Sequence, residues 1–202
     1  MSASVGRGFR SLFILMQAVL PTLADLPTLA ALSMLAALPL FFSCARSLHE
    51  TKSRTSHLIR GVPFYSQEAH QCGPASLAEV LNYWGVDVLP QDIAKEIYSK
   101  SAGGTLGMDM ALYAKKVSLK VSQYRGSLDD LKLHIDSGCP MIVLVDYGFW
   151  IFQRNHFMVI IGYDESNMIA NSGKNQLKLI PVQSFSGAWE KAAFWSLLIT
   201  PE

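Results

Sequence analysis

Residues 66–78 read SQEAHQCGPASLA, and this stretch decides the fold of the chain. Pro74 suits the first turn of a helix, because its fixed φ matches that turn and its missing N–H would have no partner there. The pattern predicts a helix that begins at Cys72 and ends at Gly85. Its apolar face would carry Leu77, Val80, Leu81 and Trp84. Cys72 therefore stands at the N-terminal end of a buried helix, where unpaired N–H groups and the helix dipole favour a thiolate.

The rest of the chain from residue 57 divides into a helical half and a strand-rich half. A short β-rich segment, 59–65, precedes the cysteine, and further helices are predicted at 90–97, at 108–117 and from a capping box at Ser127 to Ser137. After Pro140 come short apolar runs separated by turn residues, at 141–146, 156–163, 168–171, 176–180 and 194–200. This order predicts an α+β fold, in which N-terminal helices pack on a C-terminal antiparallel sheet and the active site lies where they meet.

Catalysis by a cysteine nucleophile needs a base, a group that orients the base, and hydrogen-bond donors for the oxyanion. Cys72 supplies the sulfur and its own backbone N–H. Gln67, five residues earlier, could add a side-chain amide. His156 begins the apolar run HFMVIIGY, so its imidazole would stand at a fixed edge of the sheet. Asn171, at the end of the next predicted strand, could orient that ring.

Composition excludes several other classes of protein. Seventeen Lys and Arg residues against sixteen Asp and Glu leave a net charge of +1, which gives no reason to expect nucleic acid as a partner. Three cysteines cannot form a disulfide framework, although a bridge between Cys72 and Cys139 remains an alternative in an oxidising compartment. No spacing of Cys and His suggests a zinc site, so neither a metal nor an organic cofactor is expected. The apolar loop 149–152 could line a substrate cleft or lie on a membrane surface.

The first 56 residues read as a targeting segment, 1–44, and a linker, 45–56. Residues 26–43 carry no charge, a length that suits either an export signal or a short membrane span. The sequence FFSC before and at Cys44 resembles a bacterial lipoprotein processing site, and ordinary signal cleavage is the alternative. For an uncleaved anchor, the basic residues after the span outnumber those before it, which would keep the domain on the cytoplasmic face. Export or lipidation, with the domain on the periplasmic side of the envelope, is preferred.

The segment 57–202 resembles the C39 and C39-like peptidases, papain-like enzymes known for trimming bacteriocin leader peptides. The resemblance rests on Gln67-x4-Cys72-Gly73-Pro74-Ala75-Ser76-Leu77-Ala78, on the Gly138-Cys139-Pro140 strand and on the histidine strand from His156 to Asp164. It looks closest to a stand-alone, exported branch of the family.

That resemblance implies Cys72 as nucleophile, His156 as general base and then acid, and Gln67 as oxyanion donor. Many family members have an aspartate near where this chain reads Ala170-Asn171-Ser172-Gly173, so the orienting group is Asn171, Ser172 or a residue elsewhere. The expected function is hydrolysis of a peptide bond in a peptide or protein. The alternatives are a C39-like module that binds peptides without cutting them, and acyl transfer to an amine.

Overall fold

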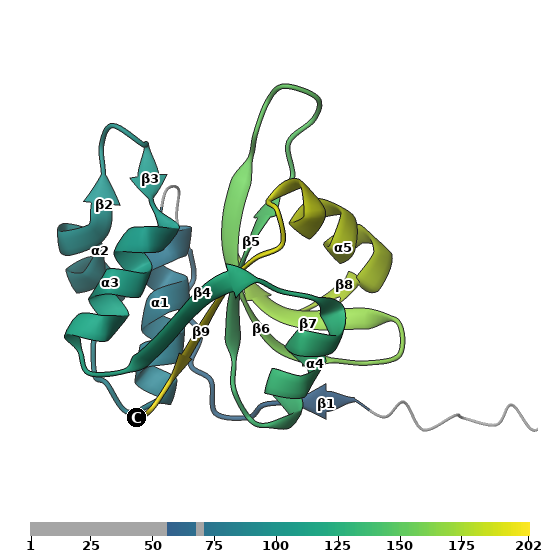
Figure 1. Ribbon diagram of the computed structural model, residues 1–202, viewed down its shortest axis with the longest axis horizontal. Helices are drawn as coiled ribbons and strands as arrows, with labels where there is room; N and C mark the ends of the chain where they lie inside the picture. The colour runs from purple at the N-terminus through teal and green to yellow at the C-terminus, as the bar shows by residue number, and fades with distance from the viewer. Residues whose placement is uncertain (1–55, 68–70) are drawn as a thin grey trace, which may run out of the picture. The chain divides into compact units, whose positions relative to one another are not determined.

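The computed structural model describes residues 56–67 and 71–202 of the chain (Figure 1). The predicted targeting segment, Cys44 and nearly all of the linker lie outside the described residues, as does His70. Within the described part, no helix is both long enough and apolar enough to cross a bilayer.

A seven-stranded antiparallel sheet forms the centre of the domain. Its strand order is β4-β9-β5-β6-β7-β8, and β1 pairs with β6 beside this path. The strands are β1 (His57–Leu58), β4 (Lys120–Arg125), β5 (Met141–Asp146), β6 (Asn155–Tyr163), β7 (Asn167–Ser172), β8 (Asn175–Pro181) and β9 (Trp195–Thr200). A separate hairpin of two short strands, β2 (Tyr98–Ser99) and β3 (Gly104–Thr105), lies between the second and third helices.

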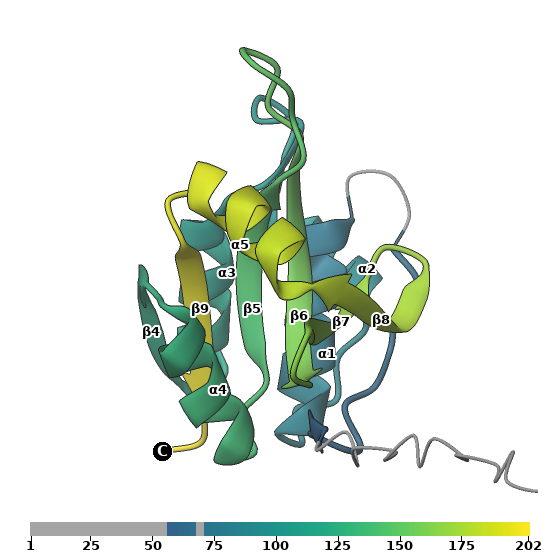
Figure 2. The same ribbon diagram turned by 90° about the vertical axis from the view of Figure 1, so that its right-hand side faces the viewer.

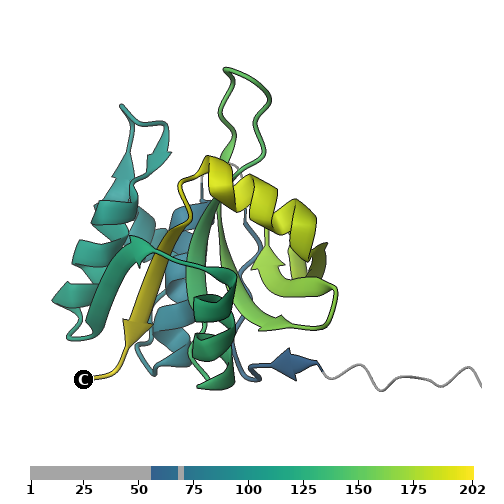
Figure 3. The same ribbon diagram turned by 45° about the vertical axis from the view of Figure 1, so that its right-hand side comes forward.

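Helices cover both faces of this sheet. Helices α1 (Cys72–Tyr83), α2 (Pro90–Ile97) and α3 (Gly107–Lys116) lie on one face, and α4 (Leu128–Asp136) and α5 (Val182–Lys191) lie on the other (Figures 1 and 2). The 45° view shows α5 running across the sheet with α1 behind it (Figure 3). The predicted packing of N-terminal helices on an antiparallel sheet is confirmed, and the second helical layer was not foreseen.

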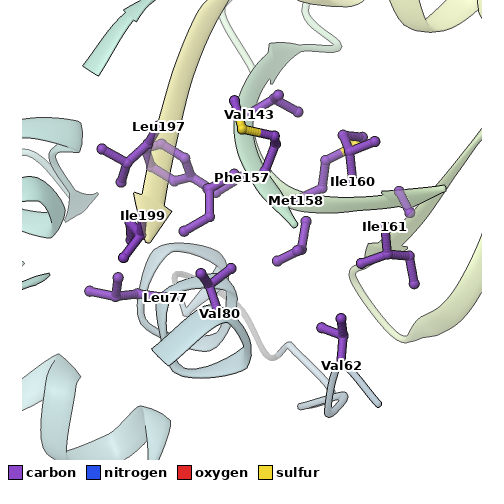
Figure 4. Packing of buried hydrophobic residues seen from close by; sticks show 14 of the residues in the cluster. Val62, Leu77, Val80, Val143, Phe157, Met158, Ile160, Ile161, Leu197 and Ile199 are labelled. Carbon is purple, nitrogen blue, oxygen red and sulfur yellow. The ribbon is translucent and has the colours of Figure 1, made fainter. Parts of the chain in front are cut away.

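The hydrophobic core fixes α1 against β6, which positions the two halves of the site. Leu77 and Val80 of α1 lie on the side of the sheet on which Phe157 of β6 and Ile199 of β9 also lie (Figure 4). All four side chains are at most 5% exposed. Burial of apolar surface on this scale is the main force that holds such a domain together. A helix held this firmly keeps its first residue in one place.

The prediction of a strand at 59–65 is wrong. Only His57 and Leu58 pair with β6, and the chain then leaves the sheet after one more hydrogen bond, from the Ile59 N–H to the Ile161 carbonyl. Gly61 adopts a φ of +82°, which breaks the extended conformation, and Pro63 has no N–H to donate. The segment therefore runs as an irregular arm toward α1.

Candidate active site

A cavity of about 530 Å³ lies where the start of α1, the β2–β3 hairpin and the start of β6 meet. Three of the four predicted site residues line it: Gln67, Cys72 and His156. The remaining lining residues are Ala102, Gly103, Gly104, Thr105, Leu106, Arg154, Asn155, Phe157 and Gly173. The structure thus brings together residues that are up to 106 positions apart in the sequence.

Cys72 is the first residue of α1, as predicted. The first backbone hydrogen bond of the helix runs from the Ala75 N–H to the Gln71 carbonyl, at 3.0 Å. Gly73 is required by a close approach, because a Cβ there would lie 2.7 Å from the Cβ of Thr105. The glycine after the cysteine therefore lets β3 form the wall of the cavity.

Gln67 is buried, with an exposed fraction of 6%. Its side-chain Oε1 accepts a hydrogen bond from the Gly173 N–H at 3.1 Å, and its backbone N–H donates to the Gly173 carbonyl at 2.9 Å. Its Nε2 lies 3.4 Å from the Ser76 Oγ. These bonds fix the amide beside Cys72 and tie the arm before α1 to the β7–β8 turn.

His156 is half-buried near the start of β6. Its Nε2 lies 3.0 Å from the Ser172 Oγ, and Nδ1 has no hydrogen-bond partner among the described residues. Burial, together with the positive charges of Lys178 and Arg154, lowers the pKa of His156 from 6.5 to about 4. The imidazole is therefore neutral near pH 7. With Nε2 bonded to Ser172, Nδ1 can accept a proton from a thiol.

The structure does not bring Asn171 to the imidazole of His156. The Asn171 side chain is fully buried, donates to the Glu79 Oε2 at 3.0 Å and to the Pro63 carbonyl at 3.3 Å, and accepts from the Leu177 N–H at 3.2 Å. Neighbouring residues of a strand point to opposite faces, so Ser172 reaches the ring because Asn171 turns away from it. Ser172 is the alternative that the sequence left open.

Glu79 is a buried carboxyl group that the sequence analysis missed. It is 0% exposed in the middle of α1, where its Oε1 accepts from the Tyr65 N–H at 3.1 Å and its Oε2 accepts from Asn171. The sequence did contain a signal, because Glu79 is the one charged residue of α1 and stands between the apolar residues Ala78 and Val80. Burial raises the pKa of Glu79 to about 7. Through these two hydrogen bonds Glu79 links α1 to the arm before it and to β7.

Glu79 and His156 should affect stability with opposite dependence on pH. The folded state binds the Glu79 proton more tightly than the unfolded state, so this group lowers the free energy of unfolding as pH rises from about 4.5 to about 7. The folded state binds the His156 proton less tightly, so that group raises the free energy of unfolding as pH rises from about 4 to about 6.5. Each shift corresponds to about 3 kcal/mol at most, and the two nearly cancel.

Glu79→Gln should therefore expose the His156 contribution. Urea unfolding at several pH values should show that the free energy of unfolding of this variant rises by about 2–3 kcal/mol between pH 4 and pH 7. The free energy of unfolding of the parent protein should change little over the same range. In the double variant Glu79→Gln/His156→Gln, the free energy of unfolding should no longer rise with pH over this range. Equal slopes in the parent and the single variant would show that Glu79 does not titrate as described.

The other residues considered in the sequence lie outside this site. Cys72 and Cys139 are both free thiols, so the alternative of a bridge between them is not realised. The loop 149–152 projects from the end of β5 and β6 (Figures 1 and 2), and its side chains are 73–90% exposed. None of its four residues lines the cavity that contains Cys72. In the described part of the chain, no three or more His, Cys, Asp or Glu side chains are grouped so that they could hold a metal ion.

Solved structures share this fold at low sequence identity. A C39-like peptidase from Bacillus anthracis is 20% identical, covers 73% of this chain and 98% of its own, and superposes with a TM-score of 0.64. The peptidase domain of Streptococcus ComA, a bi-functional ABC transporter, is 19% identical, with 70% and 100% covered and a TM-score of 0.57. A double glycine motif protease from an AMS/PCAT transporter, solved with the leader peptide, is 24% identical, with 75% and 96% covered and a TM-score of 0.57.

Sequence comparison gives the family itself. A search of curated protein sequences found no significant match. The sequence profile described as the Peptidase_C39 like family matches residues 59–196, which span the irregular arm, the helices, and the sheet as far as the start of β9. This match covers more than half of the chain and contains every residue of the cavity described above, and the fold agrees with it. The chain therefore belongs to the C39-like peptidase family.

Proposed function

We propose that this protein is a cysteine peptidase that hydrolyses peptide bonds in a peptide or protein substrate. The observation that carries the proposal is the common cavity of Cys72, His156 and Gln67, which holds a nucleophile, a neutral base and a fixed amide donor. The family and the fold support a peptidase, and this set of side chains is what thiol chemistry requires.

The proposed reaction has two steps. His156 Nδ1 takes the thiol proton as the Cys72 Sγ attacks the carbonyl carbon, and the backbone N–H of Cys72 and the Gln67 Nε2 donate to the oxyanion. The C–N bond then breaks, and the leaving amine takes the proton from His156. Water, deprotonated by the same imidazole, attacks the thioester and releases the acid and the free thiol. Ser172 holds the ring through Nε2 in both steps.

The second candidate is a module that binds an extended peptide without cutting it. One observation favours it, because the partner of His156 is a hydroxyl group and not a carboxylate, and a hydroxyl stabilises an imidazolium by dipole alone. The two candidates differ in whether any bond is broken when a peptide occupies the cavity.

A peptide library distinguishes these candidates. The full-length protein in detergent, incubated with a mixed peptide library, should produce new pairs of termini that share a sequence feature and that mass spectrometry detects. The Cys72→Ala protein should produce none. Peptides that bind the parent protein and remain intact would establish the binding module. Added amines that appear in the products would establish acyl transfer as the reaction.

We further propose that the chain works at the bacterial envelope, on the periplasmic side, attached through residues 1–44 or a lipid on Cys44. The uncharged run 26–43 and the FFSC sequence support this proposal. Cell fractionation and the intact mass of the purified chain test it. A membrane-bound protein whose added lipid mass disappears in Cys44→Ala would support lipidation, and a chain recovered entirely from the cytoplasmic fraction would contradict the proposal.

We propose that the exposed loop 149–152 contacts the lipid surface. Phe149 and Trp150 are 83% and 90% exposed, and the Lys191 Nζ donates a hydrogen bond to the Gly148 carbonyl, at the base of the loop, at 2.9 Å. Aromatic tips flanked by basic groups suit the membrane interface. In vesicles that contain brominated lipid, tryptophan fluorescence should be quenched, and Trp150→Phe should remove most of that quenching. Equal quenching in both proteins would place Trp150 away from the lipid.

A further inference from the structure

We propose that the wall of the site beside His156 is a subsite for a carboxylate of the substrate, held between Arg154 and Lys178. This inference rests on the proposed peptidase function and names the class of peptide that the site selects. The carboxylate is that of an aspartate or glutamate close to the cleaved bond, or that of a nearby C-terminus.

The subsite is a second cavity of about 370 Å³. Its lining residues are Tyr147, Arg154, Asn155, His156, Ser172, Gly173, Asn175 and Lys178. Four of these, Arg154, Asn155, His156 and Gly173, also line the cavity that contains Cys72. An extended peptide with its carbonyl at Cys72 can therefore place a neighbouring residue in the second cavity.

The charged side chains that line these two cavities are all positive. No Asp or Glu is among the described residues that line either cavity, whereas Arg154 and Lys178 both line the second. Neither cation forms an ion pair within the described part of the chain. The Asp146 Oδ1 accepts hydrogen bonds from the Gly148 and Arg154 N–H groups, both at 2.7 Å, and so holds the backbone of the loop base. The Arg154 guanidinium is left to bind a carboxylate of the substrate.

The same two charges act on the proposed base. Lys178 and Arg154, together with burial, hold the pKa of His156 at about 4 in the empty site, where the imidazole is a weak base. A bound carboxylate would offset these positive charges and move the pKa of His156 back toward 6.5. A peptide of the right charge would therefore bind more tightly and also strengthen the base that activates Cys72.

Charge reversal tests the subsite. A peptide cleaved by the full-length protein is resynthesised with Glu, Gln or Lys at each position near the cleaved bond, and with a free or amidated C-terminus. At one position Glu should raise kcat/KM about tenfold over Gln, because a partly exposed charged hydrogen bond contributes on the order of 1.5 kcal/mol. Each of the variants Arg154→Glu and Lys178→Glu should reverse this preference, so that the Lys peptide has a higher kcat/KM than the Glu peptide. Lys174→Glu is the matched control, since Lys174 lies in the same turn as Gly173 and lines neither cavity.

The outcomes separate this inference from the function on which it rests. A preference for Glu that survives both charge reversals, or equal cleavage of the Glu, Gln and Lys peptides, would overturn the subsite and leave the peptidase intact. If no peptide is cleaved, the peptidase proposal fails, and the charge preference is then read from the affinities of the Cys72→Ala protein for Glu, Gln and Lys versions of a library peptide that it binds. Loss of the preference in amidated peptides alone would identify the C-terminal carboxylate as the bound group.

Discussion

The Cys72→Ala protein should lose peptide hydrolysis by at least about 10³-fold in kcat, because removal of a nucleophile leaves only the binding and oxyanion contributions. Initial rates on the best peptide from the library measure this loss. The substitution should leave the fold unchanged, since Cys72 is only half-buried at the start of a helix whose remaining core side chains are untouched.

Cys139→Ala is the matched control for the nucleophile. Cys139 is also a half-buried free thiol, but burial raises its pKa, and its Sγ lies 3.7 Å from the Ser137 carbonyl, outside the cavity of His156. Its loss should change kcat less than about twofold. Comparable activity in Cys72→Ala and the parent protein would show that Cys72 is not the nucleophile.

The second large effect should come from His156→Gln, with a fall in kcat of about 10³-fold. A glutamine can replace the hydrogen bond to Ser172 but cannot exchange a proton with Cys72. The parent protein needs a neutral imidazole, so kcat/KM should fall only as pH drops toward about 4, the pKa of His156 in the free protein. The pH–rate profile of the variant should lack that acid limb.

Ser172→Ala separates positioning of the ring from proton transfer. It removes the 3.0 Å contact to Nε2 and leaves the imidazole, so kcat should fall about tenfold while the acid limb is retained. Asn171→Ala, in contrast, should mainly lower stability, because its amide links Glu79, Pro63 and Leu177. A large loss of kcat in Asn171→Ala, with unchanged unfolding and little loss in Ser172→Ala, would return the orienting role to Asn171.

The sequence predicted the parts of the fold that depend on local chemistry. Pro74 and the apolar spacing after Cys72 placed α1 correctly, and the long apolar run after His156 placed β6. Helix α5 was missed because Ser184, Ser186 and Gly187 have low helix propensity, and only Phe185, Ala188 and Trp189 show the buried spacing. Strand β4 was missed because its residues are at least partly exposed, without a clean alternation.

Choosing between Asn171 and Ser172 needed information that the sequence does not contain. Adjacent residues on a strand point to opposite faces of the sheet, so a shift of one residue exchanges their positions. The register of β7 is irregular against both of its neighbours, near Gly162 in its pairing with β6 and near Ser172 in its pairing with β8. The cationic wall was hidden for a similar reason. Arg154 and Lys178 come together only because β6, β7 and β8 are consecutive neighbours in the sheet, which is a property of the whole fold.

The most direct test of the account is the rate at which a thiol-directed electrophile labels each cysteine of the full-length protein, mapped by mass spectrometry. Cys72 should react much faster than Cys139, and labelling of Cys72 should block peptide cleavage. His156→Ala should slow the labelling of Cys72 and leave that of Cys139 unchanged. Labelling of Cys72 that is as slow as that of Cys139 and indifferent to His156 would contradict the account and favour the peptide-binding module.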